Sequence, residues 1–140
     1  MTINETQDQI IEEFAFLGDN WEEKYEYIID MGKRMPTMPA DLKTEQNKIK
    51  GCQSQVWIHP AFKEGIVHFE GDSDAIIVRG LVAMVLRVMN DQSPAEIAKA
   101  NLYFPQQIGM DRHLAPTRSN GLAAMIKQIR LYGLALTTQS

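Results

Sequence analysis

The fold is decided by residues 53–89, which read QSQVWIHPAFKEGIVHFEGDSDAIIVRGLVAMVLRVM. Residues 53–59 alternate in polarity and are rich in Val, Ile and Trp, a pattern that predicts a β-strand. A turn at residues 63–65 and a second β-rich run at residues 66–70 predict a strand that returns antiparallel. The turn-forming residues 71–74 are then expected to end the sheet and to cap a helix.

That helix, expected at Ala75–Met89, is apolar on nearly every side, as a central buried helix should be. Before the strands in the sequence, residues 33–50 contain two prolines and no sustained periodicity, so they predict a long connection. Long connections in compact domains are often functional. Residues 47–50 are a candidate for a short third strand.

Two helices are predicted in the N-terminal third. The first helix is expected to start at a capping box formed by Asn4 and Gln7 and to end at Gly18. The second is expected to start at a capping box formed by Asp19 and Glu22 and to end at Gly32. Apolar side chains recur at helical spacing in both: Ile10, Phe14 and Leu17, and Trp21, Tyr25, Ile28 and Ile29. This periodicity favours packing in the core over an aromatic surface for a partner.

The C-terminal part predicts two further helices. Residues 93–96 combine a capping box with a proline at the first helical position, so a helix is expected to start there and to end near Asn101. Residues 102–116 lack a period and are predicted to be irregular. The last helix is expected at Ser119–Tyr132, with Gly133 as its stop. The order of elements gives an α+β fold, a small antiparallel β-sheet with helices packed on it.

The composition excludes several classes of protein. The chain of 140 residues fits a single domain (residues 1–140), and its 44% of hydrophobic residues suffice for a core. A net charge of −4 argues against nucleic-acid binding. No apolar run approaches the roughly 20 residues that cross a bilayer, and the polar, acidic start is unlike a signal peptide. One cysteine without an export signal favours the reducing cytoplasm.

That cysteine, Cys52, lies where a loop enters the predicted strand. Its neighbours are polar or small, which favours a reactive thiol over a packed one: Gly51, Gln53 and Ser54. The alternation of the strand places Cys52 on the same face as Val56 and Ile58. We therefore expect a sulfur atom that is sheltered at the mouth of the strand but can still be reached.

Cations near this segment have two interpretations each. Lys48 and Lys50 either favour the thiolate or form a solvated pair. Arg118 precedes the expected N-cap Ser119, and a cation at the positive end of a helix dipole is unfavourable unless something compensates it. Arg118 therefore forms an ordinary ion pair or serves an anionic group or partner. His113 is either a base or hydrogen-bond donor, or a structural residue.

Four segments of the chain resemble the SufE family and follow its order: WEEKY at residues 21–25, NKIKGCQSQVW at 47–57, GDSDA at 71–75 and HLAPTRSNGL at 113–122. The resemblance covers nearly the whole chain. It implies a fold like that of the iron–sulfur scaffold IscU and a role in cytoplasmic sulfur mobilisation for iron–sulfur cluster assembly.

The resemblance also implies roles and partners. Cys52 would take sulfur from a SufS- or CsdA-like cysteine desulfurase, carry it as a transient persulfide, and pass it to a SufBCD-like scaffold complex. The chain would stimulate the desulfurase as an accessory protein and not act as an enzyme itself. Pyridoxal phosphate would stay on the partner, and this chain would hold no permanent cofactor or metal. The remaining residues would support the site or bind the partner: Arg118, Asp74, Gly51, Gln53, Ser54 and His113. A homodimer is left open.

Four other functions compete with this interpretation. A scaffold that builds clusters needs several thiolate ligands, which one cysteine cannot supply. A Cys–His hydrolase would pair Cys52 with His113, although no oxyanion-hole motif supports it. A binding module that uses Trp21 or Trp57 would tolerate replacement of Cys52. A zinc site would need about four ligands without a recognised spacing: Cys52, His59, His68 and His113.

Overall fold

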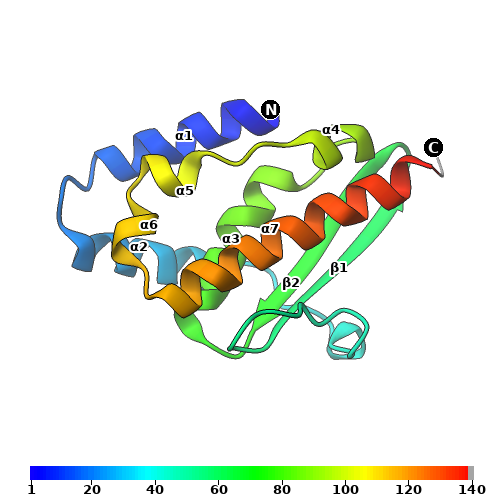
Figure 1. Cartoon of the computed structure of the whole chain (residues 1–140), viewed down its shortest axis with the longest axis horizontal. Coiled ribbons are helices and arrows are strands. Elements are labelled where there is room, and N and C mark those ends of the chain that lie inside the picture. The colour runs from blue at the N-terminus through cyan, green and yellow to red at the C-terminus, as the bar shows by residue number, and fades with distance from the viewer. Residues whose placement is uncertain (139–140) are drawn as a thin grey trace.

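The computed structural model describes residues 1–138 and has the α+β architecture that the sequence predicts. Its elements are α1 (Ile3–Ala15), α2 (Trp21–Arg34), the 3₁₀ turn η1 (Ala40–Leu42), β1 (Val56–Lys63), β2 (Ile66–Ser73), α3 (Ile76–Met89), α4 (Pro94–Lys99), α5 (Phe104–Gln107), α6 (Met110–His113) and α7 (Pro116–Thr137). The long helix α7 lies alongside the two-stranded sheet (Figure 1). Helices α1 and α2 pack on α3, on the side away from the sheet (Figure 1). None of the helices in residues 1–138 has the length and apolar character needed to cross a membrane.

The antiparallel hairpin is confirmed, but β1 starts at Val56 and not at Gln53, and both strands end later than predicted, at Lys63 and Ser73. Lys63 pairs with Ile66 across a tight turn, and the ladder continues to the pair Val56–Ser73. The sheet therefore does not end at Gly71. This glycine allows a close approach to α3, since an added Cβ would be 2.8 Å from Cγ1 of Val82. The expected third strand is reduced to one isolated bridge, Lys48 with Trp57.

Both N-terminal helices form, with corrected ends. The N-caps are one or two residues from those predicted: Thr2 in place of Asn4, and Asn20 in place of Asp19. Gly32, the expected stop of the second helix, lies inside that helix. An added Cβ on Gly32 would lie 2.7 Å from the backbone nitrogen of Gly80, and one on Gly80 only 2.2 Å from the carbonyl oxygen of Ile28. These glycines allow α2 and α3 to cross closely.

The C-terminal helices also differ in their bounds from the prediction. Ser93 caps α4 as expected, since its hydroxyl accepts a hydrogen bond from the backbone N–H of Glu96. Residues 102–116, predicted to be irregular, contain the short helices α5 and α6. Helix α7 begins after Ala115 and not at Ser119. It also continues through Gly133, where an added Cβ would lie 2.7 Å from Ile97 of α4.

The prediction that α3 is the central helix is confirmed. Nine of its residues are buried, and they pack with apolar side chains from every other helix and both strands. One hydrophobic cluster therefore joins the described elements from α1 to α7. The expectation of a single domain over residues 1–140 includes residues 139 and 140, which lie outside the described residues.

A buried ion cluster joins four parts of this fold. The carboxylate of Asp72, near the end of β2, accepts hydrogen bonds from the guanidinium of Arg79 in α3 and from the ammonium of Lys43, whose Nζ lies 2.7 Å away. Arg79 also donates to the carbonyl oxygens of Gly32, at 2.7 Å, and Met35, at 3.0 Å. Strand β2, helix α3, the end of α2 and the connection after it are thus fixed to one another.

We predict that Asp72→Asn lowers the free energy of unfolding by about 2 kcal/mol, because the half-buried Arg79 and the more exposed Lys43 lose charge-assisted hydrogen bonds to a buried carboxylate. Burial alone would raise the pKa of Asp72, but hydrogen bonds from Lys43, the Ser73 backbone and Arg79 outweigh it and lower the pKa. The carboxylate therefore stabilises the fold above its unfolded-state pKa, and this contribution is lost as the pH falls through the lowered folded-state pKa.

Denaturant titrations at neutral pH measure this effect. The matched control is Glu45→Gln, which removes an exposed carboxylate that pairs with Lys48, and it should change stability by less than about 1 kcal/mol. Equal effects of the two substitutions would contradict a special role for Asp72.

Candidate functional site

Cys52 lies in a closed loop, residues 50–55, immediately before β1. The backbone N–H of Ile49 donates a 2.8 Å hydrogen bond to the carbonyl oxygen of Val56, which brings the two ends of the loop together. Cys52 is therefore not part of the strand, so strand alternation does not set the direction of its side chain. Its side chain is nevertheless half-buried and packs against the core.

Asp74 anchors the C-terminal end of this loop. Its carboxylate accepts a 3.0 Å hydrogen bond from the backbone N–H of Gln55, and its own N–H donates to the Gln55 carbonyl at 3.2 Å. Gly51 permits the turn at the other end, because its φ of +89° is a conformation that L side chains rarely adopt. An added Cβ there would also lie 3.3 Å from Cβ of Ala124 in α7. These residues position the loop that carries Cys52.

Helix α7 shelters the sulfur atom. Sγ of Cys52 lies 3.5 Å from the carbonyl oxygen of Gly121, to which the thiol donates a weak hydrogen bond. An added Cβ on Gly121 would lie 3.5 Å from the same Sγ, at van der Waals contact distance. The sulfur therefore lies close to the backbone of α7 at this glycine. The expected sheltering is thus present, but a helix that comes about 70 residues later in the chain provides it.

The surroundings favour the neutral thiol. Burial raises the pKa of Cys52, and no charged neighbour offsets this effect in the described structure. The two lysines were expected either to favour the thiolate or to form a solvated pair. Lys48 pairs with Glu45 at 3.5 Å, and Lys50 is exposed. The nucleophilic thiolate therefore needs a change in the environment of Cys52.

A hollow of about 240 Å³ opens beside the sulfur, between the loop, α3 and α7. It is lined by Cys52, Gln53, Ser54, Val78, Leu81, Ala115, Thr117, Arg118, Gly121 and Met125. Arg118 lies in the first turn of α7, close to the expected helix start, and its side chain is exposed. Within residues 1–138 it forms no ion pair, so the interpretation of Arg118 as an ordinary surface pair finds no support.

His113 lies outside this hollow. Its ring stacks on that of Trp21, with centroids 4.3 Å apart and planes at 20°, and its backbone oxygen accepts a hydrogen bond from the hydroxyl of Tyr25. It has no hydrogen bond to Cys52, so the geometry gives no Cys–His pair for a hydrolase. His113 fixes the end of α6 to α2 instead.

The candidate zinc ligands do not lie together either. Nδ1 of His59 lies 3.4 Å from Oδ1 of Asn47, and Nδ1 of His68 lies 3.0 Å from Oδ1 of Asp91. In the part of the chain that the structure describes, no three His, Cys, Asp or Glu side chains form a group that could hold a metal ion.

Sequence reasoning missed the apolar wall of the hollow, which α3 and α7 contribute as Val78, Leu81 and Met125. Their apolar periodicity indicated burial, but nothing local in the sequence placed them beside Cys52. Gly121 carried a usable signal, since a glycine near the start of a long helix often marks a close approach.

Comparison with known proteins decides the family. The family model described as "SufE: Fe-S metabolism associated domain" matches residues 8–132. This chain belongs to the SufE family. Uncharacterized SufE-like proteins of Rhizobium meliloti (strain 1021) and Rhizobium etli are each 45% identical over 128 residues. The matches cover 88% of this chain and 91% and 86% of those proteins.

A solved structure shares the fold of this SufE-family chain. It is the solution structure of a hypothetical protein from Thermus thermophilus, with a TM-score of 0.78, 18% identity, and coverage of 95% of this chain and 96% of that one. The family resemblance and the fold class predicted from the sequence are therefore confirmed, and the chain belongs to a family associated with iron–sulfur metabolism.

The sheltered position of Cys52 leads to a prediction about its reactivity. Because burial raises its pKa, alkylation by iodoacetamide should rise with pH around a midpoint above that of the same chain unfolded in denaturant. Removing the loop anchor in Asp74→Ala should speed alkylation at neutral pH by about fivefold, the effect of one lost hydrogen bond on loop opening.

Mass-resolved alkylation time courses measure both effects. The matched control is Asp41→Ala, which removes a carboxylate of η1 that has no hydrogen bond or ion pair in residues 1–138, and it should leave the rate unchanged. A folded-state midpoint at or below that of the unfolded chain would show that the thiol is not sheltered.

Proposed function

We propose that this SufE-family chain accepts sulfur from a pyridoxal-phosphate-dependent cysteine desulfurase, carries it as a persulfide on Cys52, and delivers it for iron–sulfur cluster assembly in the cytoplasm. The observation that carries the proposal is that the only cysteine of the chain lies on an anchored loop, beside a hollow that also contains an unpaired arginine. Family membership supplies the link to iron–sulfur metabolism.

The transfer step balances without an external oxidant. The thiolate of Cys52 attacks the outer sulfur of a desulfurase persulfide, Cys–S–SH, and forms a new S–S bond. The S–S bond of the donor breaks, and the donor cysteine leaves as a thiolate. The sulfane sulfur moves between two cysteines, and the rate depends on the thiolate fraction, the leaving group and access.

The arrangement around Cys52 supports a carrier more than a catalyst. A thiol with a raised pKa beneath α7 is protected between transfers, and delivery requires the loop or the first turn of α7 to move. Docking a desulfurase would supply that movement. Arg118, exposed at the opening, is placed to pair with the thiolate or with a carboxylate of the partner.

Three further parts of the proposal rest on the family. The chain is an accessory protein that stimulates the desulfurase, and pyridoxal phosphate stays on that enzyme. A SufBCD-like scaffold complex receives the sulfur. The competing function, a binding module that does not use its thiol, makes a different prediction for Cys52.

Desulfurase turnover separates these two functions. With a purified SufS-like desulfurase, pyridoxal phosphate and cysteine, the wild-type chain should increase the rate of alanine formation, and Cys52→Ser should not, because no thiolate remains to take the sulfur. Asp41→Ala serves again as the control and should stimulate like the wild type. Full stimulation by Cys52→Ser would support the binding module.

The same assay tests Arg118. Arg118→Ala removes a cation from the N-terminal turn of α7, so the melting temperature should hold or rise slightly. Stimulation should nevertheless fall, because no guanidinium is present to pair with the thiolate once it is exposed or with a carboxylate of the partner. A lower melting temperature with normal stimulation per folded molecule would make Arg118 a structural residue.

A further inference from the structure

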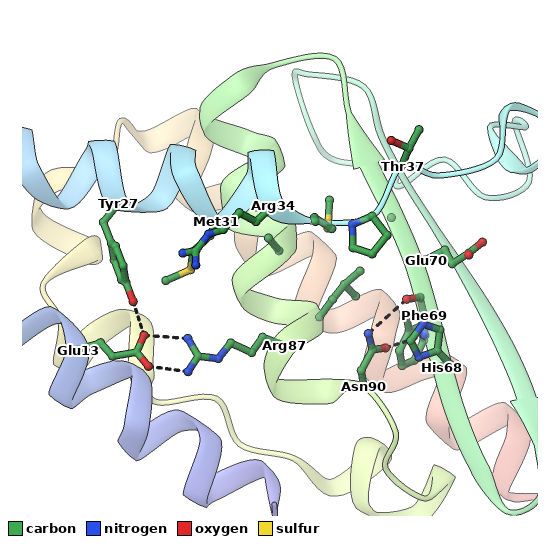
Figure 2. A pocket seen from close by; sticks show the side chains of 15 residues that line it. Glu13, Tyr27, Met31, Arg34, Thr37, His68, Phe69, Glu70, Arg87 and Asn90 are labelled. Carbon is green, nitrogen blue, oxygen red and sulfur yellow. Dashed lines mark hydrogen bonds and ion pairs between the residues drawn. The ribbon is translucent and has the colours of Figure 1, made fainter.

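A second cleft of about 490 Å³ lies between α2, α3 and the outer edge of β2. We call it the β2-edge groove, and it shares no residue with the hollow at Cys52. Figure 2 shows it between a polar cluster at Glu13, Tyr27 and Arg87 and the strand edge at Phe69 and Glu70. Nothing in the sulfur-transfer proposal uses this groove.

The outer edge of β2 is closed over most of its length. Val67 donates its N–H to the carbonyl of Gln92 and accepts the N–H of Asp91, both at 2.9 Å. Phe69 donates its N–H to the side-chain oxygen of Asn90 at 2.7 Å, and the amide nitrogen of Asn90 donates back to the Phe69 carbonyl at 3.4 Å. The side chain of Asn90 thus takes the place of a neighbouring strand.

Gly71 is the next residue on this edge, and no described residue pairs with its backbone there. The N–H of Ile58, its partner in β1, donates to the carbonyl of Asn47, so Gly71 belongs to a pair that exchanges no hydrogen bonds across the ladder. The N–H and C=O of Gly71 therefore point outward, to the groove, and neither has a hydrogen-bond partner in residues 1–138. Gly71 is buried, and unpaired backbone groups at such a place are costly.

The rest of the groove adds apolar and charged contacts. Apolar side chains line its floor: Met31, Met35, Ala83 and Leu86. At its polar end Arg87 is already satisfied, because it donates to both carboxylate oxygens of Glu13, at 2.8 and 2.6 Å (Figure 2). Arg34 at the rim pairs with Asp30 through Nε alone, at 3.0 Å, and both side chains are mostly exposed. Its terminal nitrogens can bind a carboxylate.

We propose that the β2-edge groove binds an extended segment of a partner protein by strand addition. One residue of the segment exchanges two backbone hydrogen bonds with Gly71, an apolar side chain next to it packs on the floor, and an acidic residue pairs with Arg34. The backbone pairing selects a polypeptide over a lipid or a small anion, because only an extended chain presents a C=O and an N–H together. The proposal is independent of Cys52.

The test uses the full chain and peptides selected from a random, phage-displayed decapeptide library. Selected peptides should carry an apolar and an acidic residue, and in ¹⁵N-labelled protein they should shift the Gly71 amide resonance downfield and slow its hydrogen exchange. Methylating the peptide nitrogen that pairs with Gly71 should abolish binding while every side chain is kept.

Three variants locate the site on the protein. Ala83→Gln projects a longer side chain into the groove and should abolish binding, and Arg34→Gln should weaken it by about fivefold. Lys33→Gln removes a neighbouring exposed cation outside the groove and should bind like the wild type. Should Ala83→Gln fail to fold, Thr37→Trp at the exposed rim replaces it.

The proposal is overturned if no peptide is enriched. It is also overturned if enriched peptides leave the Gly71 resonance unmoved, or if they bind the folded Ala83→Gln or Thr37→Trp variant like the wild type. None of these three outcomes would affect the role of Cys52, since the groove variants should retain full desulfurase stimulation.

Discussion

The carboxylate of Asp72 is held away from solvent at the end of β2, where Arg79 and Lys43 both donate to it. Through Arg79 the same cluster donates to two carbonyl oxygens at the C-terminal end of α2, those of Gly32 and Met35. Two residues beyond Asp72, the side chain of Asp74 holds the end of the Cys52 loop. The segment that holds the Cys52 loop is therefore fixed by a buried charge that does not touch the thiol.

Shelter and reactivity oppose each other at Cys52. The contact with α7 and the burial of the sulfur favour a neutral, protected thiol, whereas attack on a persulfide needs an exposed thiolate. Exposing the sulfur breaks a weak thiol–carbonyl hydrogen bond to α7, while Asp74 holds the C-terminal end of the loop. The first turn of α7 has no side-chain cap, and Arg118 within it forms no ion pair in the described chain. Under the proposed function, a partner that binds this turn would expose the sulfur.

Local signals were enough to predict the hairpin, the central helix α3 and the Ser93 cap, because each depends on residues that are neighbours in sequence. The errors arose where contacts with a segment far away in the sequence determine the local structure. Gly32 and Gly133 were predicted to stop helices, yet both lie inside helices at close crossings with α3 and α4. The shelter of Cys52 was expected, but its source, Gly121, is 69 residues away. No pattern in the sequence indicated the Asp72 cluster or the open edge at Gly71.

The account depends most on whether sulfur arrives at Cys52. Intact-mass analysis of the chain after incubation with a cysteine desulfurase, pyridoxal phosphate and cysteine measures this directly. The chain should gain the mass of one sulfur atom, mapped to the peptide that contains Cys52 and removed by a reductant. An unchanged mass while the desulfurase turns over and responds to this chain would contradict the account.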